Sequence, residues 1–79
     1  MDKKEIIEKL NEIFQDVMDN EDIVVTESTS MEDIDEWDSL SHVQLCIAIK
    51  REFGYKASAL EMRQWKNVGA IVNTLSNLS

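Results

Sequence analysis

A recurring pattern constrains the fold most: a helix-capping residue precedes apolar residues that are spaced three or four positions apart. Asp2, Asp38, Ser58 and Asn67 each carry a side-chain oxygen that can accept from the backbone N–H groups of a first helical turn. The chain has no proline and only two glycines, so little interrupts a helix once it has begun. This pattern predicts one small all-α domain over residues 1–79, a four-helix bundle with three main helices and one short helix.

The apolar spacing sets the bounds of the four predicted helices. We expect a first helix over residues 3–18, a second over 39–53, a short third over 59–64 and a fourth from 68 to about 78. Gly54 is the expected stop of the second helix. The residues expected to face inward from the first and fourth helices are Ile6, Leu10, Ile13, Phe14, Val17, Val68, Ile71, Val72, Leu75 and Leu78, with Ile7 and Met18 at the margin.

Residues 19–38 form a long first connection between helices. A structureless segment of this length is uncommon in a small domain unless apolar side chains hold it against the helices. One short turn of helix is expected within residues 28–31. The apolar residues expected to hold the connection in place are Ile23, Val24, Val25, Met31 and Ile34.

Negative charge is concentrated in the first half of the chain. The net charge is −8, and residues 1–38 contribute −11 while residues 39–79 contribute +3. Ten acidic residues and no Lys or Arg lie between Asp16 and Asp38. Such a surface repels a phosphate backbone, so nucleic acid is excluded as a partner, and enzymes with basic surfaces are expected instead.

The cysteine content and the absence of long apolar runs indicate where the protein is expected to be in the cell. One cysteine, Cys46, excludes an internal disulfide and is expected to be a small buried apolar residue. No apolar run approaches the ~18 residues of a membrane span, and the charged N-terminus lacks a signal-peptide pattern. We therefore expect a cytoplasmic monomer without stable membrane insertion.

A single hydroxyl, that of Ser39, stands at the junction between the acidic connection and the second helix. Asp38 is the expected cap, so Ser39 falls in the first helical turn, near unpaired backbone N–H groups and the positive end of the helix dipole. A phosphate ester on this oxygen would be favoured there. The junction is thus a suitable place to attach a phosphodiester group.

The triplet Asp38-Ser39-Leu40 resembles the acyl carrier protein family, in which the same triplet opens the second helix. The likeness extends through the second helix, to the lead-in Ser30-Met31-Glu32-Asp33-Ile34 and to Asn67-Val68-Gly69-Ala70-Ile71 at the last helix. The resemblance implies a bundle of acyl-carrier type and a covalent 4'-phosphopantetheine on Ser39, transferred from coenzyme A. It also implies a thioester-bound acyl group, presented to partner enzymes of fatty acid or lipid biosynthesis.

The implied partners are a phosphopantetheinyl transferase, an acyl- or aminoacyl-loading enzyme and downstream transferases. Asp38 and Leu40 are expected to flank the cofactor. Trp37 is expected to pack, or else to cover the base of the arm, and His42 is expected to be exposed beside the modified serine. Both are also candidate partner-recognition residues. Leu40 and Val43, which with Ile47 follow helical spacing, could pack inward or contact partner enzymes, and so could Met62. For a sheltered lipid-like cargo, Ile47, Val43, Ile71 and Phe14 are the candidate lining residues.

Four other interpretations of these residues differ from an acyl carrier. A Ser-His-Asp hydrolase is disfavoured because Asp38 adjoins Ser39 and cannot orient His42, and no glycine-rich elbow precedes the serine, so no catalytic residues are expected. Asp33, Asp35 and Asp38 lack the Gly and Glu of a calcium loop, so no metal site is expected. An aminoacyl carrier of D-alanyl or peptidyl type, and an unmodified acidic interaction module, stay open as alternatives.

The second helix departs from the family pattern in its charge. Carriers of fatty-acid synthesis have an acidic second helix, whereas the corresponding positions here hold Ser41, Gln44, Lys50 and Arg51, and only Glu52 is negative. This difference predicts a specialised carrier rather than one of housekeeping fatty-acid synthesis.

Overall fold

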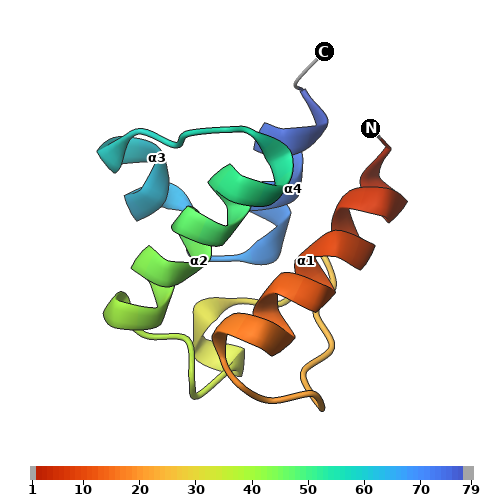
Figure 1. The fold of residues 1–79 in the computed structure, drawn as a ribbon, viewed down its shortest axis with the longest axis vertical. Helices are drawn as coiled ribbons and strands as arrows, with labels where there is room; N and C mark the ends of the chain where they lie inside the picture. The colour runs from red at the N-terminus through yellow and green to blue at the C-terminus, as the bar shows by residue number, and fades with distance from the viewer. Residues whose placement is uncertain (1, 78–79) are drawn as a thin grey trace.

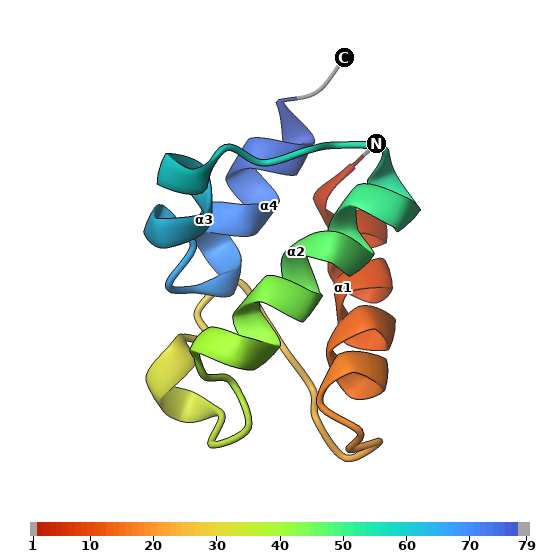
Figure 2. The same ribbon diagram turned by 60° about the vertical axis from the view of Figure 1, so that its left-hand side comes forward.

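The computed structural model describes residues 2–77 and forms, in that range, four α-helices and one short 3₁₀ helix (Figure 1). The elements are α1 (Lys3–Val17), η1 (Met31–Asp33), α2 (Ser39–Phe53), α3 (Ala59–Gln64) and α4 (Val68–Ser76). α1 packs against α2 and α4, and α3 packs against α2 (Figure 2). The predicted all-α bundle with three main helices, one short helix and a long first connection is confirmed.

All four predicted caps are present. Asp2 accepts from the Glu5 N–H at 2.8 Å, and Asn67 accepts from the Ala70 N–H at 2.7 Å. Ser58 and Glu61 form the expected reciprocal capping box of α3. Each cap satisfies backbone donors that a helix start otherwise leaves unpaired, which is why these helices begin where the sequence predicts.

The helix ends differ slightly from the prediction. α1 ends at Val17, and Met18 is its C-cap. Gly54 ends α2 with a φ of +69°, a left-handed conformation that favours glycine. α4 ends at Ser76, and the predicted inward residue Leu78 lies outside the described residues. The fully buried side chains that form the centre of the core are Ile6, Leu10, Phe14, Leu45, Ile49, Val68, Ile71 and Val72.

Side-chain amides of α1 hold the long connection in place. The Asn11 amide donates to the Val25 carbonyl at 3.1 Å, and its oxygen accepts from the Val25 N–H at 2.7 Å. The Gln15 amide donates to the Ile23 carbonyl at 2.8 Å. Ile23, Val25 and Ile34 are buried as predicted, and Met31 is half-buried. The prediction for Val24 was wrong: it is 75% exposed, because its neighbours on both sides turn inward.

The second half of the connection is fastened to the start of α4. The Met31 N–H donates to the Lys66 carbonyl and the Val68 N–H donates to the Thr29 carbonyl, both at 2.8 Å. The helical turn expected within residues 28–31 lies later, at Met31–Asp33, because Ser30 caps it together with Asp33. These bonds fix the backbone that leads to Ser39.

α2 buries a different face from the one its most evident apolar stripe indicates. Leu40, Val43 and Ile47 are 73%, 46% and 55% exposed. These side chains therefore face outward rather than into the core. The buried face carries Ser41, His42, Leu45, Cys46 and Ile49. Two polar residues can occupy this face because each finds hydrogen-bond partners, as described below.

Candidate functional site

Ser39 is the first residue of α2 and is exposed to solvent. Within residues 2–77 its hydroxyl makes no hydrogen bond, so the oxygen is open to solvent. It lies where the acidic connection meets the helix, at the lower end of α2 in Figure 1. The sequence predicts this position for the Ser39 hydroxyl, and hydrogen bonds of the neighbouring residues fix the backbone around it.

A reciprocal pair of hydrogen bonds between Asp38 and Ser41 fixes the start of α2. The Asp38 carboxylate accepts from the Ser41 N–H at 3.0 Å, and the Ser41 hydroxyl accepts from the Asp38 N–H at 2.9 Å. The Ser41 hydroxyl also donates to the Glu36 carbonyl at 2.7 Å. The bond from the Ser41 N–H holds the pKa of Asp38 below its usual value, so this cap stays ionised. Ser39, between these residues, is thereby held at a fixed backbone position.

A buried hydrogen-bonded chain lies beneath this turn. The Trp37 indole N–H donates to Nδ1 of His42 at 2.9 Å, and Nε2 of His42 lies 2.6 Å from the Met62 carbonyl. Because an indole nitrogen can only donate, Nδ1 of His42 is the acceptor. Nε2 therefore carries the hydrogen and donates it in a hydrogen bond to the Met62 carbonyl. Trp37 also packs edge-on against Phe14, with ring centroids 4.9 Å apart. This chain joins the start of α2 to α1 and α3.

The structure therefore corrects two expectations. His42 was expected to be exposed, but it is 9% exposed, since its ring packs beneath the helix rather than beside the serine. Trp37 is 3% exposed, so it takes the packing role and is not available on the surface as a partner-recognition residue or a cover for the arm. Val43 is exposed and Met62 half-buried, so both stay predictions as recognition residues.

Two cations lie next to the candidate serine. A hollow at the start of α2 is lined by Ser39, His42 and Met31 together with Met62, Arg63 and Lys66. Arg63 and Lys66 are exposed and form no ion pair with any described residue. A phosphate on Ser39 would thus meet two positive side chains as well as the N-terminus of α2.

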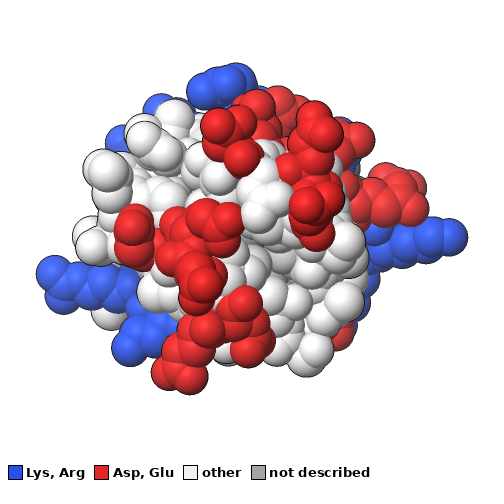
Figure 3. Space-filling view, turned by 90° about the horizontal axis from the view of Figure 1, so that it is seen from below, with Lys and Arg blue, Asp and Glu red and all other residues white. Residues whose placement is uncertain are grey.

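Acidic side chains gather on the end of the bundle formed by the first connection. Figure 3 views this end and shows Asp and Glu across its surface, with Lys and Arg at its edges. The Asn20 amide donates to the Glu36 carboxylate at 2.9 Å and is the main reason that the pKa of Glu36 is lowered. The surface before Ser39 is therefore strongly anionic, while the surface after it is cationic.

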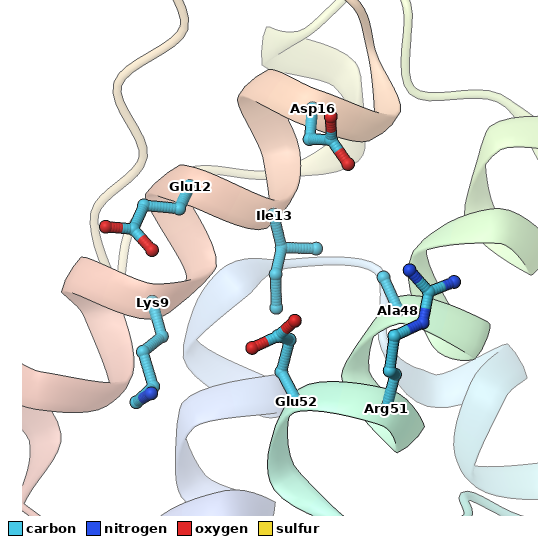
Figure 4. Close-up of a pocket in the computed structure, with 7 residues that line it drawn as sticks. All are labelled: Lys9, Glu12, Ile13, Asp16, Ala48, Arg51 and Glu52. Atoms are coloured by element: carbon cyan, nitrogen blue, oxygen red, sulfur yellow. The ribbon is translucent and has the colours of Figure 1, made fainter.

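A second hollow, between α1 and α2, does not belong to this site. It is lined by Lys9, Glu12, Ile13 and Asp16 of α1 and by Ala48, Arg51 and Glu52 of α2 (Figure 4). It contains neither Ser39 nor the apolar residues exposed on α2. Its mixed charges resemble a solvated helix interface rather than a binding site.

The four residues proposed to line a sheltered cargo space are not neighbours in one cavity. Phe14 and Ile71 are fully buried in the core, whereas Val43 and Ile47 are largely exposed on α2, so that grouping was wrong. Cys46 is buried as predicted, and burial raises the pKa of its thiol to about 11. The thiol is therefore protonated and unreactive near neutral pH.

A small helical bundle with an exposed serine at the capped start of its second long helix is the arrangement expected of one class, small helical carrier domains. The comparisons agree with this class. Residues 8–75 match the family model described as "Phosphopantetheine attachment site". The chain is 38% identical over 77 residues to the acyl carrier protein of Petrotoga mobilis, covering 96% of this chain and 89% of that protein.

The fold is also similar to the solution NMR structure of the holo acyl carrier protein from Geobacter metallireducens. The TM-score is 0.81 at 37% sequence identity, covering 89% of this chain and 80% of that one. This chain therefore belongs to the acyl carrier protein family. The predicted covalent phosphopantetheine cofactor and the role of an acyl carrier are confirmed.

Sequence reasoning missed two parts of the site. Ser41 could have been found, because Asp38 with a hydroxyl residue three positions on is a variant of the capping-box pattern. The cations Arg63 and Lys66 gave no local signal, since only the packing of α3 against α2 brings them to Ser39.

Within residues 2–77, no helix is long and apolar enough to cross a bilayer.

Proposed function

We propose that Ser39 is the residue that receives 4'-phosphopantetheine and that this chain performs no catalysis itself. The exposed, unbonded Ser39 hydroxyl at the capped start of α2 is the observation that carries the proposal. When it is bound, the arm supplies a terminal thiol that holds an acyl group as a thioester. The other residues of the site act by position and charge.

The residues around Ser39 suit a phosphodiester. Arg63 and Lys66 line the same hollow as the serine, which stands in the first turn of α2, where the helix dipole favours an anion. Asp38 is occupied by the Ser41 N–H and keeps the turn rigid. A transferase would therefore meet an exposed hydroxyl on a backbone that is already fixed, with cations placed to offset the charge of the attached phosphate.

The geometry offers no general base for a reaction at Ser39. Both ring nitrogens of His42 are engaged, one by Trp37 and the other by Met62. A base must reach the proton that it removes, and this imidazole is held against the core instead. The carrier is thus acted upon by a phosphopantetheinyl transferase and by acyl-handling enzymes, which are the kinds of partner this family has.

We also propose that the partners belong to a specialised pathway and recognise the acidic connection together with a cationic α2. Lys50 and Arg51 are exposed on α2, while Asp and Glu side chains cover the end of the bundle formed by the first connection (Figure 3). Charge of this kind steers association and selects partners. The test is loading by an acyltransferase of fatty-acid synthesis: malonyl transfer as efficient as to that enzyme's own carrier would refute the specialised role.

The attachment site is tested by intact mass spectrometry after incubation with coenzyme A, magnesium and a broad-specificity phosphopantetheinyl transferase. We expect one phosphopantetheine on the wild type and none on Ser39→Ala. Ser28→Ala is a matched control that removes another exposed hydroxyl and should still be modified. Modification of a folded Ser39→Ala, or of neither folded protein while a known carrier is modified, would overturn the assignment.

A further inference from the structure

Large apolar side chains that remain exposed gather on α2 and on the neighbouring α3. Four of the five such side chains within residues 2–77 lie there, and they are Leu40, Val43, Ile47 and Leu60. The fifth, Val24, lies on the first connection. A cluster of exposed apolar side chains marks a surface that contacts another molecule or a lipid bilayer.

The exposed residues of α2 form one stripe on the side of the helix toward α3. Leu40, Val43, Ile47 and Lys50 recur every three or four residues, so their side chains share one face of the helix. Val43, Ile47 and Lys50 also line a common hollow with Met62 of α3. Figure 2 shows α3 on one side of α2 and α1 on the other.

Positive side chains accompany this stripe. Lys50 and Lys56 line the same hollow as the stripe, while Arg63 and Lys66 line the adjoining hollow at the start of α2. All four are exposed, and no carboxylate lies within 4 Å of any of them among the described residues. We refer to the stripe, Leu60 and these four cations as the α2–α3 face. It combines exposed apolar side chains with unpaired positive ones.

The nearby carboxylates do not offset this charge. Residues 39–66 contain only Glu52 and Glu61. Glu61 accepts from the Ser58 N–H at 3.1 Å and from the Tyr55 hydroxyl, and Glu52 lines the hollow toward α1 (Figure 4). The other carboxylates of the connection gather at one end of a bundle that measures 32 × 25 × 21 Å (Figure 3). Because exposed charges are screened over about 8 Å in physiological salt, the α2–α3 face is locally positive although the net charge is −8.

We propose that the α2–α3 face makes a reversible contact with the surface of a bilayer that contains anionic lipids. The aliphatic side chains would enter the boundary between headgroups and acyl chains, as those of interfacial amphipathic helices do. The Lys and Arg side chains would reach the headgroup phosphates while their stems lie along apolar groups. Ser39 borders this face, so a group carried there would be held close to the bilayer. The contact itself does not require modification of Ser39.

The composition of the α2–α3 face favours a bilayer over a protein partner. Interfaces between proteins rely on Trp, Tyr and Arg anchors, and Leu and Val are under-represented among them. Here the exposed apolar residues are all aliphatic, whereas the aromatic side chains of Phe53, Tyr55 and Trp65 are half-buried or buried. A second copy is disfavoured, because a two-fold interface would set the cations of one face against those of the other.

The test uses the full, unmodified chain in co-sedimentation with vesicles. One set contains phosphatidylglycerol and phosphatidylcholine in equal parts, and the other contains phosphatidylcholine alone. Each Lys or Arg near an anionic membrane raises binding about fivefold, so four of them give half-saturation at a lipid concentration of the order of millimolar. We expect binding to the anionic vesicles to be at least about tenfold stronger than to the neutral ones at about 0.1 M salt. Most of this difference should be lost at about 0.5 M salt.

Two charge variants locate the contact. Lys50→Gln with Lys56→Gln should weaken binding to the anionic vesicles about tenfold or more. The control, Lys3→Gln with Lys4→Gln, removes the same charge from exposed positions on α1 and should bind within about twofold of the wild type. Far-UV circular dichroism checks that each variant is folded, as expected for changes at exposed side chains.

Two apolar variants separate side-chain insertion from charge alone. Ile47→Gln should weaken binding to the anionic vesicles about threefold or more, because the bilayer no longer takes up an apolar side chain at that position. The control is Val24→Gln, which changes a 75% exposed apolar residue on the acidic connection and should leave binding unchanged.

Absence of wild-type binding to the anionic vesicles at millimolar lipid would overturn the proposal and leave the α2–α3 face to a protein partner. Equal losses in the two charge variants would refute this face as the contact surface, and an unchanged Ile47→Gln would refute insertion of its apolar side chains. These results are independent of the attachment site, because the chain is tested unmodified. Failure of Ser39 to accept phosphopantetheine would therefore overturn the proposed function alone.

Discussion

The buried chain from Trp37 through His42 to Met62 yields a stability prediction whose size follows from its contacts. Replacing His42 with Leu keeps a side chain of similar bulk beneath α2 but removes both hydrogen bonds. Trp37 is 3% exposed, so its indole N–H would be left buried without an acceptor. The change therefore tests whether this chain, rather than apolar packing alone, fixes the start of α2.

The expected loss combines two terms of different size. An unsatisfied buried donor costs about 1–3 kcal/mol, which applies to the Trp37 N–H. The Met62 carbonyl loses less, because the Trp65 N–H still approaches it at 3.4 Å. We expect His42→Leu to lower the free energy of unfolding by about 2–4 kcal/mol, a large share of the roughly 4–12 kcal/mol available to a domain of 79 residues.

The assay is urea unfolding followed by far-UV circular dichroism at neutral pH, with a double-mutant cycle. Trp37→Phe removes the indole donor, so His42→Leu should cost about 1–2 kcal/mol less in that background than in the wild type. Gln44→Leu is the control, since Gln44 is exposed on the same helix and its change should stay within about 0.5 kcal/mol. The dependence of the unfolding free energy on urea should not change, because the surface exposed on unfolding is similar.

Additive losses, with the two single changes summing to the double change within about 0.5 kcal/mol, would refute the coupling between Trp37 and His42. A loss for His42→Leu no greater than that of Gln44→Leu would refute the structural role of the imidazole. Either result would mean that the cap formed by Asp38 and Ser41 is sufficient to fix the position of Ser39.

Two further changes test the capped turn and a close backbone contact. The folded-state pKa of Asp38 is lowered, so ionised Asp38 stabilises the fold above its unfolded-state pKa, and this contribution is lost as pH falls through the folded-state pKa. Asp38→Asn keeps a capping oxygen that does not titrate. The difference in thermal midpoint between the wild type and this variant should therefore become smaller as the pH is lowered from 7 to 3. A difference that stays constant over this range would contradict the prediction. In Gly69→Ala the new Cβ would lie 2.8 Å from the Glu27 carbonyl oxygen. We expect a loss of about 1–3 kcal/mol, measured as a midpoint at least ~4 °C lower, with exposed Ser28→Ala as the control; an unchanged midpoint would show that the connection moves aside freely.

The course of the helices could be predicted from the sequence because each helix start is a local event. Asp2, Asp38, Ser58 and Asn67 cap the four helices in the structure as the sequence indicates, since the capping oxygen and its N–H partners lie within three residues of each other. The stop at Gly54 is local for the same reason. The position of Ser39 in the first turn of α2 follows directly from these signals.

The face that α2 buries could not be predicted in the same way. The helix carries two apolar stripes, one with Val43 and Ile47 and the other with Leu45 and Ile49, and helical spacing alone does not choose between them. The choice depends on the indole of Trp37, which gives His42 a buried partner and so makes a polar residue acceptable on the inner face. That partner lies across the turn and is decided by packing.

The sequence by itself determined the helices, their caps, the acidic connection and the exposed serine at the start of α2, because each depends on residues close together in the chain. Only the tertiary structure decided that His42 is buried, that Arg63 and Lys66 line the same hollow as Ser39, and that Val43 and Ile47 are exposed on α2. These features depend on how α3 returns to pack on α2, and no short-range pattern records that path.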